Sequence, residues 1–381
     1  MPYDVAALRR EEFPWTAERI WLDNASIGPL PARTVAAVEA YNRDRQAPYR
    51  LNHDTLFGLL ERSRRLAARL IGADPDEIAL TTNTSYGLNL AARMLPLEEG
   101  DIVLTSDQEF PANIYPWLML KDKGVRLERV PVTAEGWPDE ERILWRLDDP
   151  RVRVLAISLV QFHTGYRVDL DRLGERCRAT GTLLVVDAIQ ACGVLPVDVR
   201  DTPVDLLSCG AQKWLLSPWG SGFLYVNRAW HERLTPPFAG WTAFEGTDDF
   251  TSITTYDERW LSDARRFELI SLPFQDFAGM NESLDLLLSL GLTDIARHVL
   301  GTHEPVRQWA ARRGVRIVTP AGPHGSGMIC VAMPDLARAH GALKEAGVSC
   351  SLREGAIRLS PHCFTTVEEM ERVAAVLDSV L

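Results

Sequence analysis

Lysine is scarce in this chain of 381 residues. Its four lysines are Lys121, Lys123, Lys213 and Lys344, so arginine accounts for 37 (41 − 4) of the 41 basic residues. Acidic residues number 52, the net charge is −11, and the sequence contains no block of basic residues. This balance argues against a nucleic-acid-binding surface and against a surface for anionic membranes.

Several other patterns are missing. The six cysteines form no CxxC pair, which predicts reduced thiols and a cytoplasmic location. The eight histidines form no HExxH or other clustered pattern, so we predict no metal site. The longest apolar runs, such as LDLLLSLGL at 284–292, are too short to span a bilayer, and the N-terminal MPYDVAALRREEFPW is too charged for a signal peptide.

From about residue 54 the sequence alternates between helical and strand patterns. The stretch DTLFGLLERSRRLAARLIG has apolar residues at helical spacing, and we expect this helix to begin at Asp54 and end at Gly72. Apolar, β-rich runs predict strands at 77–82, 101–105, 125–132, 152–160, 182–188, 204–209 and 222–226, with helices between most of them. This order predicts an α/β fold with a mostly parallel sheet covered by helices on both faces.

After about residue 245 the pattern changes. Long helices are expected at 276–290 and 293–311, followed by short strands near 315–318, 327–333 and 347–351, a hairpin at 351–360 and a terminal helix. We therefore expect a large domain at 31–245 and a smaller α+β domain at 246–381. Residues 1–30 are expected to form an arm that packs on the small domain or on a partner subunit.

Lys213 lies in an unusual setting, the apolar stretch GAQKWLLSPWGSGF at 210–223. One interpretation is that its carbon chain covers apolar surface while the ammonium reaches water. The other is a neutral amine that acts as a nucleophile, a role that arginine cannot fill. This stretch does not decide between the two, so the neighbouring motifs must.

Three further motifs favour the second interpretation. Asp187 ends the strand TLLVVDA, where ligands of parallel sheets bind, with a solvated loop residue or helix cap as the alternative. Thr84 and Ser85 stand at a strand-to-helix junction that suits a phosphate, or they are ordinary N-caps. Phe110 stands at another such junction, as a plate for a planar ligand or as a core aromatic. An activatable lysine, a carboxylate, a phosphate cradle and an aromatic plate together are the set that pyridoxal phosphate requires.

The sequence also resembles a known family. The segments WLDNASIGPLP, EFPANIYPW, VQFHTGYRVDL, VVDAIQ, QKWLLSPWGSGFLYV and SLREGAIRLSPHCFTT run from residue 21 to residue 366. They are similar to those of the class V aminotransferase group of fold-type I pyridoxal-phosphate enzymes, which includes cysteine desulfurases, kynureninase and isopenicillin N epimerase-like proteins. The resemblance implies a seven-stranded-type sheet, an amino-acid substrate and a homodimer with shared active sites.

The resemblance also implies roles for individual residues. Lys213 would form the Schiff base with the cofactor, and Asp187 would pair with the ring nitrogen N1. The remaining cofactor contacts would be Thr84, Ser85 and Gln212 at the phosphate, Phe110 on the ring, Gln190 at the phenolic oxygen, and Ser271 and Trp241 reaching the partner subunit's site. Arg358 matches the arginine that takes the substrate carboxylate, with an exposed ion pair as the alternative. His163 would face the substrate, or else be a packed core histidine.

The reaction type is less constrained than the cofactor. A desulfurase of this group needs a nucleophilic cysteine on a loop just before the carboxylate-binding arginine. The short LREGAI has none, since Cys350 precedes it and Cys363 follows Arg358. RRFELISLPF lacks the asparagine expected in kynureninase. Transamination needs no further residue and is our prediction, with a lyase or an epimerase as alternatives. A nucleotide-binding module is the non-enzymatic alternative, but neither GxGxxG nor GxxxxGK[ST] is present.

Overall fold

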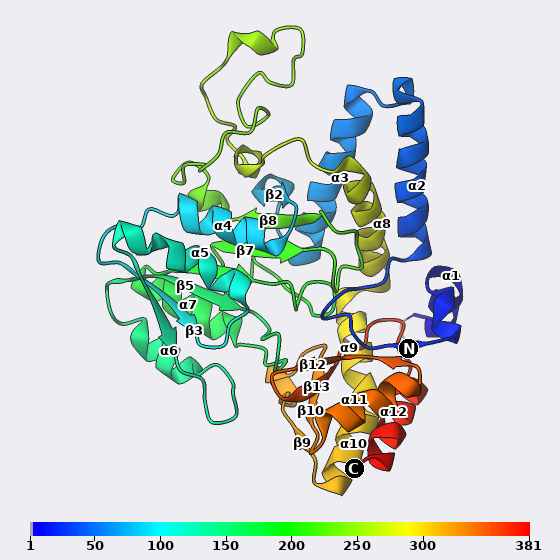
Figure 1. Cartoon of the computed structure of the whole chain (residues 1–381). Coiled ribbons are helices and arrows are strands. Elements are labelled where there is room, and N and C mark those ends of the chain that lie inside the picture. The colour runs from blue at the N-terminus through cyan, green and yellow to red at the C-terminus, as the bar shows by residue number, and fades with distance from the viewer. Residues whose placement is uncertain (1–2) are drawn as a thin grey trace.

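A seven-stranded sheet forms the centre of the molecule (Figure 1). The computed structural model describes residues 3–381. The strand order of the sheet is β2–β8–β7–β6–β5–β3–β4. Every neighbouring pair of strands is parallel except the two that include β8, which runs antiparallel to β2 and β7. The strands are β2 (Ile78–Thr81), β3 (Ile102–Ser106), β4 (Arg126–Val130), β5 (Val152–Ser158), β6 (Leu183–Asp187), β7 (Leu206–Gly210) and β8 (Gly222–Val226). The predicted, mostly parallel sheet is confirmed.

Helices cover both faces of this sheet because successive strand residues point to opposite sides. Leu184 and Val186 of β6 pack into one apolar core, whereas Val185 between them packs into the other. The first core lies under α3 (His53–Ile71), α6 (Glu140–Arg146), α7 (Leu170–Thr180) and α8 (Phe274–Leu290). The second lies under α4 (Thr84–Met94) and α5 (Tyr115–Leu118). The strands are buried on both sides, which accounts for their nearly continuous apolar sequences.

Helix α3 begins at His53, one residue before the predicted start. Asn52 has extended backbone and its side chain accepts a hydrogen bond from the Thr55 N–H, so Asn52 is the N-cap and Asp54 lies in the first turn. The helix ends at Gly72, as predicted, with that glycine in the left-handed conformation at φ 69°. Helix α3 packs against α8, which also packs against α2 (Ala32–Gln46).

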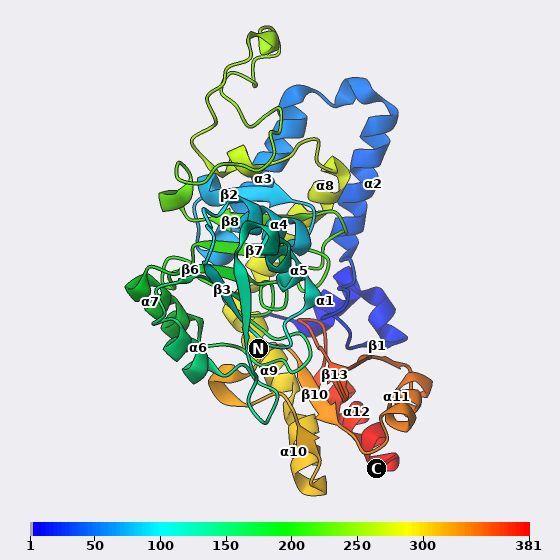
Figure 2. The ribbon, with the colours of Figure 1, turned by 60° about the vertical axis from the view of Figure 1, so that its left-hand side comes forward.

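The C-terminal part of the chain forms a second sheet with its own core (Figure 2). Its antiparallel order is β12–β13–β10–β9. The elements here are α9 (Leu292–Thr302), α10 (Glu304–Arg313), β9 (Arg316–Ile317), β10 (Ile329–Ala332), α11 (Leu336–Glu345), β11 (Val348–Ser349), β12 (Ser351–Arg353), β13 (Ala356–Leu359) and α12 (Val367–Ser379). The predicted single helix at 293–311 is wrong, because the chain breaks between α9 and α10, where Pro305 occupies the first turn of α10 and has no N–H to continue the earlier helix.

The N-terminal segment joins this second sheet region to the large one. After α1 (Val5–Glu12), strand β1 (Ile20–Trp21) pairs in parallel with β11. Asp23 then bridges to Ser360, and the Gly28 N–H donates to the Gln212 carbonyl at 2.9 Å. Residues 23–28 therefore lie between the C-terminal part of the chain and the loop that carries Lys213.

Two further features concern the outside of the molecule. Residues 245–262 form a long loop that extends away from the sheet, near the connected ends of α2 and α3 (Figures 1 and 2). None of the helices in residues 3–381 combines the length and apolar composition needed to cross a bilayer.

Candidate active site

Lys213 and Asp187 are brought to the same edge of the large sheet. Asp187 is the last residue of β6, and Lys213 follows the end of the neighbouring strand β7 by three residues. The two strands are parallel, with Asp187 in register with Ser208, so both leave the sheet in the same direction. Their juxtaposition follows from the topology, since the carboxyl ends of parallel strands meet at one edge.

Burial shifts the pKa of both groups in the direction that favours the uncharged form. Asp187 is buried, and loss of solvation raises the pKa of its carboxyl to about 7, against the effect of the Ile189 N–H that donates to it at 3.0 Å. Burial likewise lowers the pKa of the Lys213 amine to about 8, although the charge of Asp187 opposes this shift. In the described chain the two groups influence each other's pKa without forming a direct ion pair. Both the amine and the carboxyl can therefore be neutral at little cost.

The N-terminus of α4 faces the start of the Lys213 loop. Asn83 caps this helix by accepting from the Tyr86 N–H, so neither Thr84 nor Ser85 is the cap. The Thr84 hydroxyl is buried and accepts from the Gly210 N–H at 2.8 Å, whereas Ser85 is exposed. The backbone N–H groups of Thr84 and Ser85 have no acceptor within their own helix. These donors, together with the helix dipole, suit an anion.

Gly210 shows how little space remains beside this helix end. A Cβ built on Gly210 would lie 2.6 Å from the Gln212 Oε1 and 3.1 Å from both the backbone nitrogen and Oγ1 of Thr84. The side chain of Gln212 thus reaches the same point as the first turn of α4. Thr84, Ser85 and Gln212 are brought together here.

Phe110 lies over the Lys213 amine. Its ring centroid is 5.5 Å from the Lys213 Nζ, and 42% of the residue is exposed, so the ring borders an open space instead of filling a core. The ring of Phe162 packs edge-on against it, with centroids 5.2 Å apart. Phe162 holds Phe110 from one side and leaves its other surface free.

Gln190 is buried in a network of its own. Its Nε2 donates to the Ala25 carbonyl at 3.0 Å, and its Oε1 accepts from the Trp214 indole at 2.7 Å. One N–H of the amide remains to donate elsewhere. The side chain is rigidly oriented next to the residue that follows Lys213.

Arg358 is the most buried cation near the site, with 2% of the residue exposed. Its Nη1 donates to the Phe162 carbonyl at 2.8 Å and its Nη2 to the Ser26 hydroxyl at 2.6 Å, while Nε donates to Ser351 at 3.2 Å. Burial and the nearby Arg353 lower its pKa. His163 is also buried; burial lowers its pKa, and its Nδ1 has no protein partner among the described residues.

Trp241 and Ser271 lie elsewhere on the chain. Both are exposed, and neither stacks on nor hydrogen-bonds to the residues around Lys213 within residues 3–381. Trp241 belongs instead to an aromatic group with Phe57 and Phe250. Within this single chain, these two residues are separate from the other predicted site residues.

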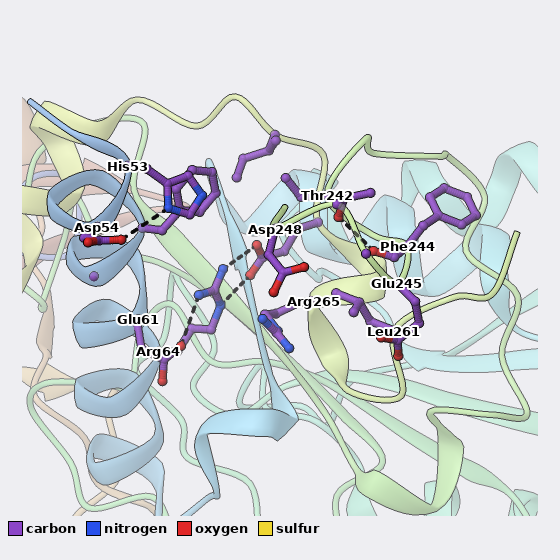
Figure 3. Close-up of a pocket in the computed structure, with 16 residues that line it drawn as sticks. His53, Asp54, Glu61, Arg64, Thr242, Phe244, Glu245, Asp248, Leu261 and Arg265 are labelled. Atoms are coloured by element: carbon purple, nitrogen blue, oxygen red, sulfur yellow. Dashed lines mark hydrogen bonds and ion pairs between the residues drawn. The ribbon is translucent and has the colours of Figure 1, made fainter. Parts of the chain in front are cut away.

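The surface beside these two residues contains a cavity of about 470 Å³ (Figure 3). It lies between the first half of α3 and the segments around Thr242 and Ile270. At one side Arg64 forms a buried, bidentate ion pair with Glu268, at 2.6 and 2.9 Å. None of the residues near Lys213 lines this cavity, so it is distinct from the site at the sheet edge.

The sequence analysis missed a buried carboxyl next to Phe110. Glu109 accepts from the Ser158 backbone N–H at 2.9 Å and from the Gln161 amide at 2.7 Å, and also from the Ser158 hydroxyl. Burial raises its pKa, and its proximity raises that of Asp187 further. A charged residue inside QEFPANIYPW, beside a predicted aromatic plate, was the available signal. Arg353 and Ser26 near Arg358 were also missed, because only the folded hairpin brings them there.

Comparisons with known proteins agree with this geometry. A family model described as Aminotransferase class-V matches residues 20–373. The chain is 31% identical over 361 residues to the uncharacterized aminotransferase YcbU of Bacillus subtilis (strain 168), covering 95% of this chain and 94% of that protein. It is 30% identical over 384 residues to isopenicillin N epimerase of Streptomyces clavuligerus, covering 94% of each. The apo structure of a cysteine desulfurase from Thermococcus onnurineus NA1 has a TM-score of 0.87 at 23% identity, covering 98% of each chain, and shows the same fold.

Proposed function

Because the chain belongs to the class V aminotransferase family, we propose that it is a pyridoxal-phosphate enzyme that transfers the amino group of an amino acid, with Lys213 as its central residue. The observation that carries this proposal is the pairing of a half-buried amine, whose pKa is lowered to about 8, with a buried carboxyl on the adjacent strand. An amine and a carboxyl that form no ion pair with each other in the described chain match the aldehyde and the ring nitrogen that a pyridine aldehyde presents.

The residues present fit this cofactor. The first turn of α4 offers N–H donors with Ser85 and Gln212 beside them, and the close approach at Gly210 leaves no room for a larger side chain at that position. The free surface of Phe110 suits a flat ring. We assign Thr84, Ser85 and Gln212 to the phosphate, Phe110 to the ring face, Asp187 to the ring nitrogen and Gln190 to the phenolic oxygen.

The protein's contribution to the chemistry then follows from its own groups. When bound, the cofactor withdraws electrons from the bonds at the substrate Cα. Asp187 would pair with a protonated ring nitrogen, because a cation beside a buried carboxylate favours its charged form and opposes the rise in pKa that burial causes. The Lys213 amine would accept the Cα proton in its neutral form, and its lowered pKa keeps a large neutral fraction near pH 8. Arg358 binds the α-carboxylate and so fixes which Cα bond lies in position to break.

Cysteine-based sulfur transfer has weak support in this chain. The turn between β12 and β13 consists of Glu354 and Gly355 and carries no cysteine. Cys350 is partly buried, and burial raises its pKa to about 12. Cys363 is fully buried with its pKa raised well above the ordinary value. Neither thiol is poised as a thiolate, so we favour transamination over desulfuration.

We further propose a cytoplasmic homodimer in which each subunit contributes to the other's site. Trp241 and Ser271 are exposed and neither stacks on nor hydrogen-bonds to the residues around Lys213 within residues 3–381, as expected of residues that serve a second chain. The six cysteines are free thiols, as expected for a reducing compartment. Sedimentation of an active monomer would remove both residues from the site.

The decisive experiment for the reaction type uses purified holo-protein. It is incubated with individual amino acids, and the cofactor and products are separated by chromatography. Conversion of the cofactor to its pyridoxamine form supports transamination. Release of sulfide, or of ammonia with a keto acid while the cofactor stays in its aldehyde form, supports a lyase, and loss of stereochemistry without net conversion supports an epimerase; either result would overturn the proposed reaction. Lys213→Ala is expected to abolish each activity, with Lys344→Ala as the control.

A further inference from the structure

Two arginines converge on one serine at the substrate end of the site. Arg353 Nη2 donates to the Ser26 Oγ at 3.2 Å, and Arg358 Nη2 donates to the same atom at 2.6 Å. An uncharged oxygen thus holds two guanidinium groups close together. Because Ser26 accepts both bonds, its own hydroxyl hydrogen stays available to a further acceptor.

The hairpin between β12 and β13 produces this arrangement. Ser351 pairs with Arg358, and Arg353 lies two residues along β12, so side chains of Arg353 and Arg358 share one face of the sheet. The turn needs only Glu354 and Gly355, both with positive φ, at 41° and 81°. This short turn keeps Arg353 beside Arg358 instead of on an extended loop.

The charge at this point is poorly balanced by carboxylates. Asp23 approaches Arg358 at 3.5 Å, and Arg353 forms no ion pair with a carboxylate within residues 3–381. Glu354 lies close enough to raise the pKa of His163, but it pairs with neither arginine. Two like charges that share a neutral acceptor repel each other, and a bound anion would relieve that repulsion.

The two arginines differ in what they can still bind. Arg358 donates one N–H from each of its three guanidinium nitrogens to a protein oxygen, which leaves at most two of its five N–H groups, and the residue is 2% exposed. Arg353 is partly exposed and uses one N–H on the Leu352 carbonyl and one on Ser26, which leaves three of its five N–H groups. Arg353 therefore has the free donors needed for a bidentate contact with an anion.

Both arginines face the reactive amine. Each lowers the pKa of Lys213 electrostatically, and the segment that carries Ser26 is bonded to the Lys213 loop through the Gly28 N–H. The more buried guanidinium, that of Arg358, suits a carboxylate attached directly to the substrate Cα. The more exposed guanidinium of Arg353 suits an anionic group further from Cα, at the end of the substrate's side chain.

We propose that Arg353 is a specificity-determining residue that, with the Ser26 hydroxyl, binds a second anionic group, so that the preferred substrate is an α-amino acid with an acidic side chain. This inference rests on the proposed function for the role of Arg358, but the anion-binding site itself does not depend on turnover.

The binding test uses holo-protein, calorimetry and pairs of unreactive acids. Succinate and glutarate carry two carboxylates, and butyrate carries one. Wild-type protein is expected to bind the better dicarboxylate at least about tenfold more tightly than butyrate, as expected for one added charged hydrogen bond. Arg353→Gln is expected to bring the two within about twofold and to leave butyrate binding unchanged. Arg338→Gln, an exposed arginine of the same region without an ion pair in the described chain, is the matched control and keeps the wild-type preference.

A second readout separates this inference from the proposed function. Absorbance titration of the holo-protein compares aspartate with asparagine and glutamate with glutamine. A preference for the acidic member of a pair, lost in Arg353→Gln, supports the inference. If the neutral amino acids perturb the cofactor absorbance equally well, or if dicarboxylates bind no better than butyrate, the role of Arg353 is overturned while the proposed function stands. If no amino acid perturbs the absorbance, the proposed function fails, and the calorimetric comparison still decides whether Arg353 binds an anion.

Discussion

The indole N–H of Trp214, the residue that follows Lys213, donates to Oε1 of Gln190 at 2.7 Å. Both side chains are buried. The carbonyl of Trp214 also accepts from Nε2 of His362, which must carry the proton because Nδ1 accepts from the Cys363 N–H. The backbone next to Lys213 is thus held both from the end of β6 and from the C-terminal part of the chain.

This arrangement predicts a measurable cost for losing one hydrogen-bond donor. Trp214→Phe keeps an aromatic ring but leaves Oε1 of Gln190 buried without a partner, which we expect to lower the free energy of unfolding by about 1–3 kcal/mol. Urea unfolding of the cofactor-free protein measures this. Trp219→Phe, at an exposed position, is the control and is expected to change stability by no more than about 0.5 kcal/mol. If both variants lowered the free energy of unfolding equally, the Trp214–Gln190 hydrogen bond would contribute nothing particular to stability.

Asp187 predicts a specific pH dependence of stability. Its pKa in the folded, cofactor-free chain is about 7, above its ordinary value of 3.8, so the folded state binds more protons than the unfolded state between these values. The free energy of unfolding therefore falls as the pH rises from about 4 to 7. Asp187→Asn removes this titration, and we expect the variant to be more stable than wild type at pH 8, by on the order of 1–4 kcal/mol, and similar at pH 4.

The check is unfolding of cofactor-free wild type and Asp187→Asn across this pH range. Asp201→Asn removes one carboxylate from an exposed position and serves as the matched control. A difference between wild type and Asp187→Asn that stays constant with pH would contradict the assigned burial of the charge. The same variant, loaded with cofactor, is expected to lose most activity.

Lys213 predicts a distinctive reactivity among the four lysines. With its pKa near 8, about half of its amine is neutral at pH 8, whereas an ordinary lysine is neutral on the order of 1% or less. Competitive labelling of the cofactor-free protein with an amine-acylating reagent, followed by mass spectrometry, gives the pH profile of each lysine. We expect the profile of Lys213 to have its midpoint near pH 8. The exposed Lys121, Lys123 and Lys344 are internal controls, and a Lys213 profile that follows theirs would refute the lowered pKa.

The buried ion pair between Arg64 and Glu268 predicts a large effect on stability. Glu268 also accepts from the Leu80 N–H at 2.9 Å, so it joins α3 and β2 to the segment that leads to Ser271. Glu268→Gln removes the buried carboxylate partner of Arg64 and leaves only the partly exposed Glu61, at 3.4 Å, so we expect a loss of about 3–5 kcal/mol in the free energy of unfolding.

The exposed pair between Arg65 and Glu61, at 3.5 Å, supplies the comparison. Arg65→Gln is expected to cost about 0–1 kcal/mol in the same denaturant experiment. If the two substitutions had similar effects, the Arg64–Glu268 pair would not be an anchor for the 268–271 segment.

The fold and the family were predictable from the sequence because their signals are local or periodic. The apolar runs that end in Asp187 and in SCGAQK predicted the two strands beside the site, and the family match confirms the resemblance. The break after Thr302 was missed, because helical periodicity continues through it and only Pro305 marks the boundary. Asn52 was likewise missed as a cap, since Asp54 is an equally good capping residue two positions later.

The site was predictable in part for the same reason. Lys213, Asp187 and Phe110 stand at junctions of strands with loops, and the topology brings such junctions together. Ser26 and Arg353 carry no local pattern that distinguishes them from surface residues, and Glu109 is marked only by its place beside Phe110. Their positions depend on the packing of Glu109 under β5 and of the β12–β13 hairpin against the N-terminal segment, which only the tertiary structure fixes.

The central claim is that the amine of Lys213 binds the cofactor's aldehyde covalently, and borohydride reduction followed by peptide mapping tests it most directly. Reduction makes the carbon–nitrogen link permanent, so mass spectrometry can locate it among the four lysines. We predict one pyridoxyl phosphate group per chain on the peptide that contains Lys213, present in Lys344→Ala and absent in Lys213→Ala. Label on Lys121, Lys123 or Lys344 would contradict the account. So would the absence of label on protein that has been loaded with pyridoxal phosphate.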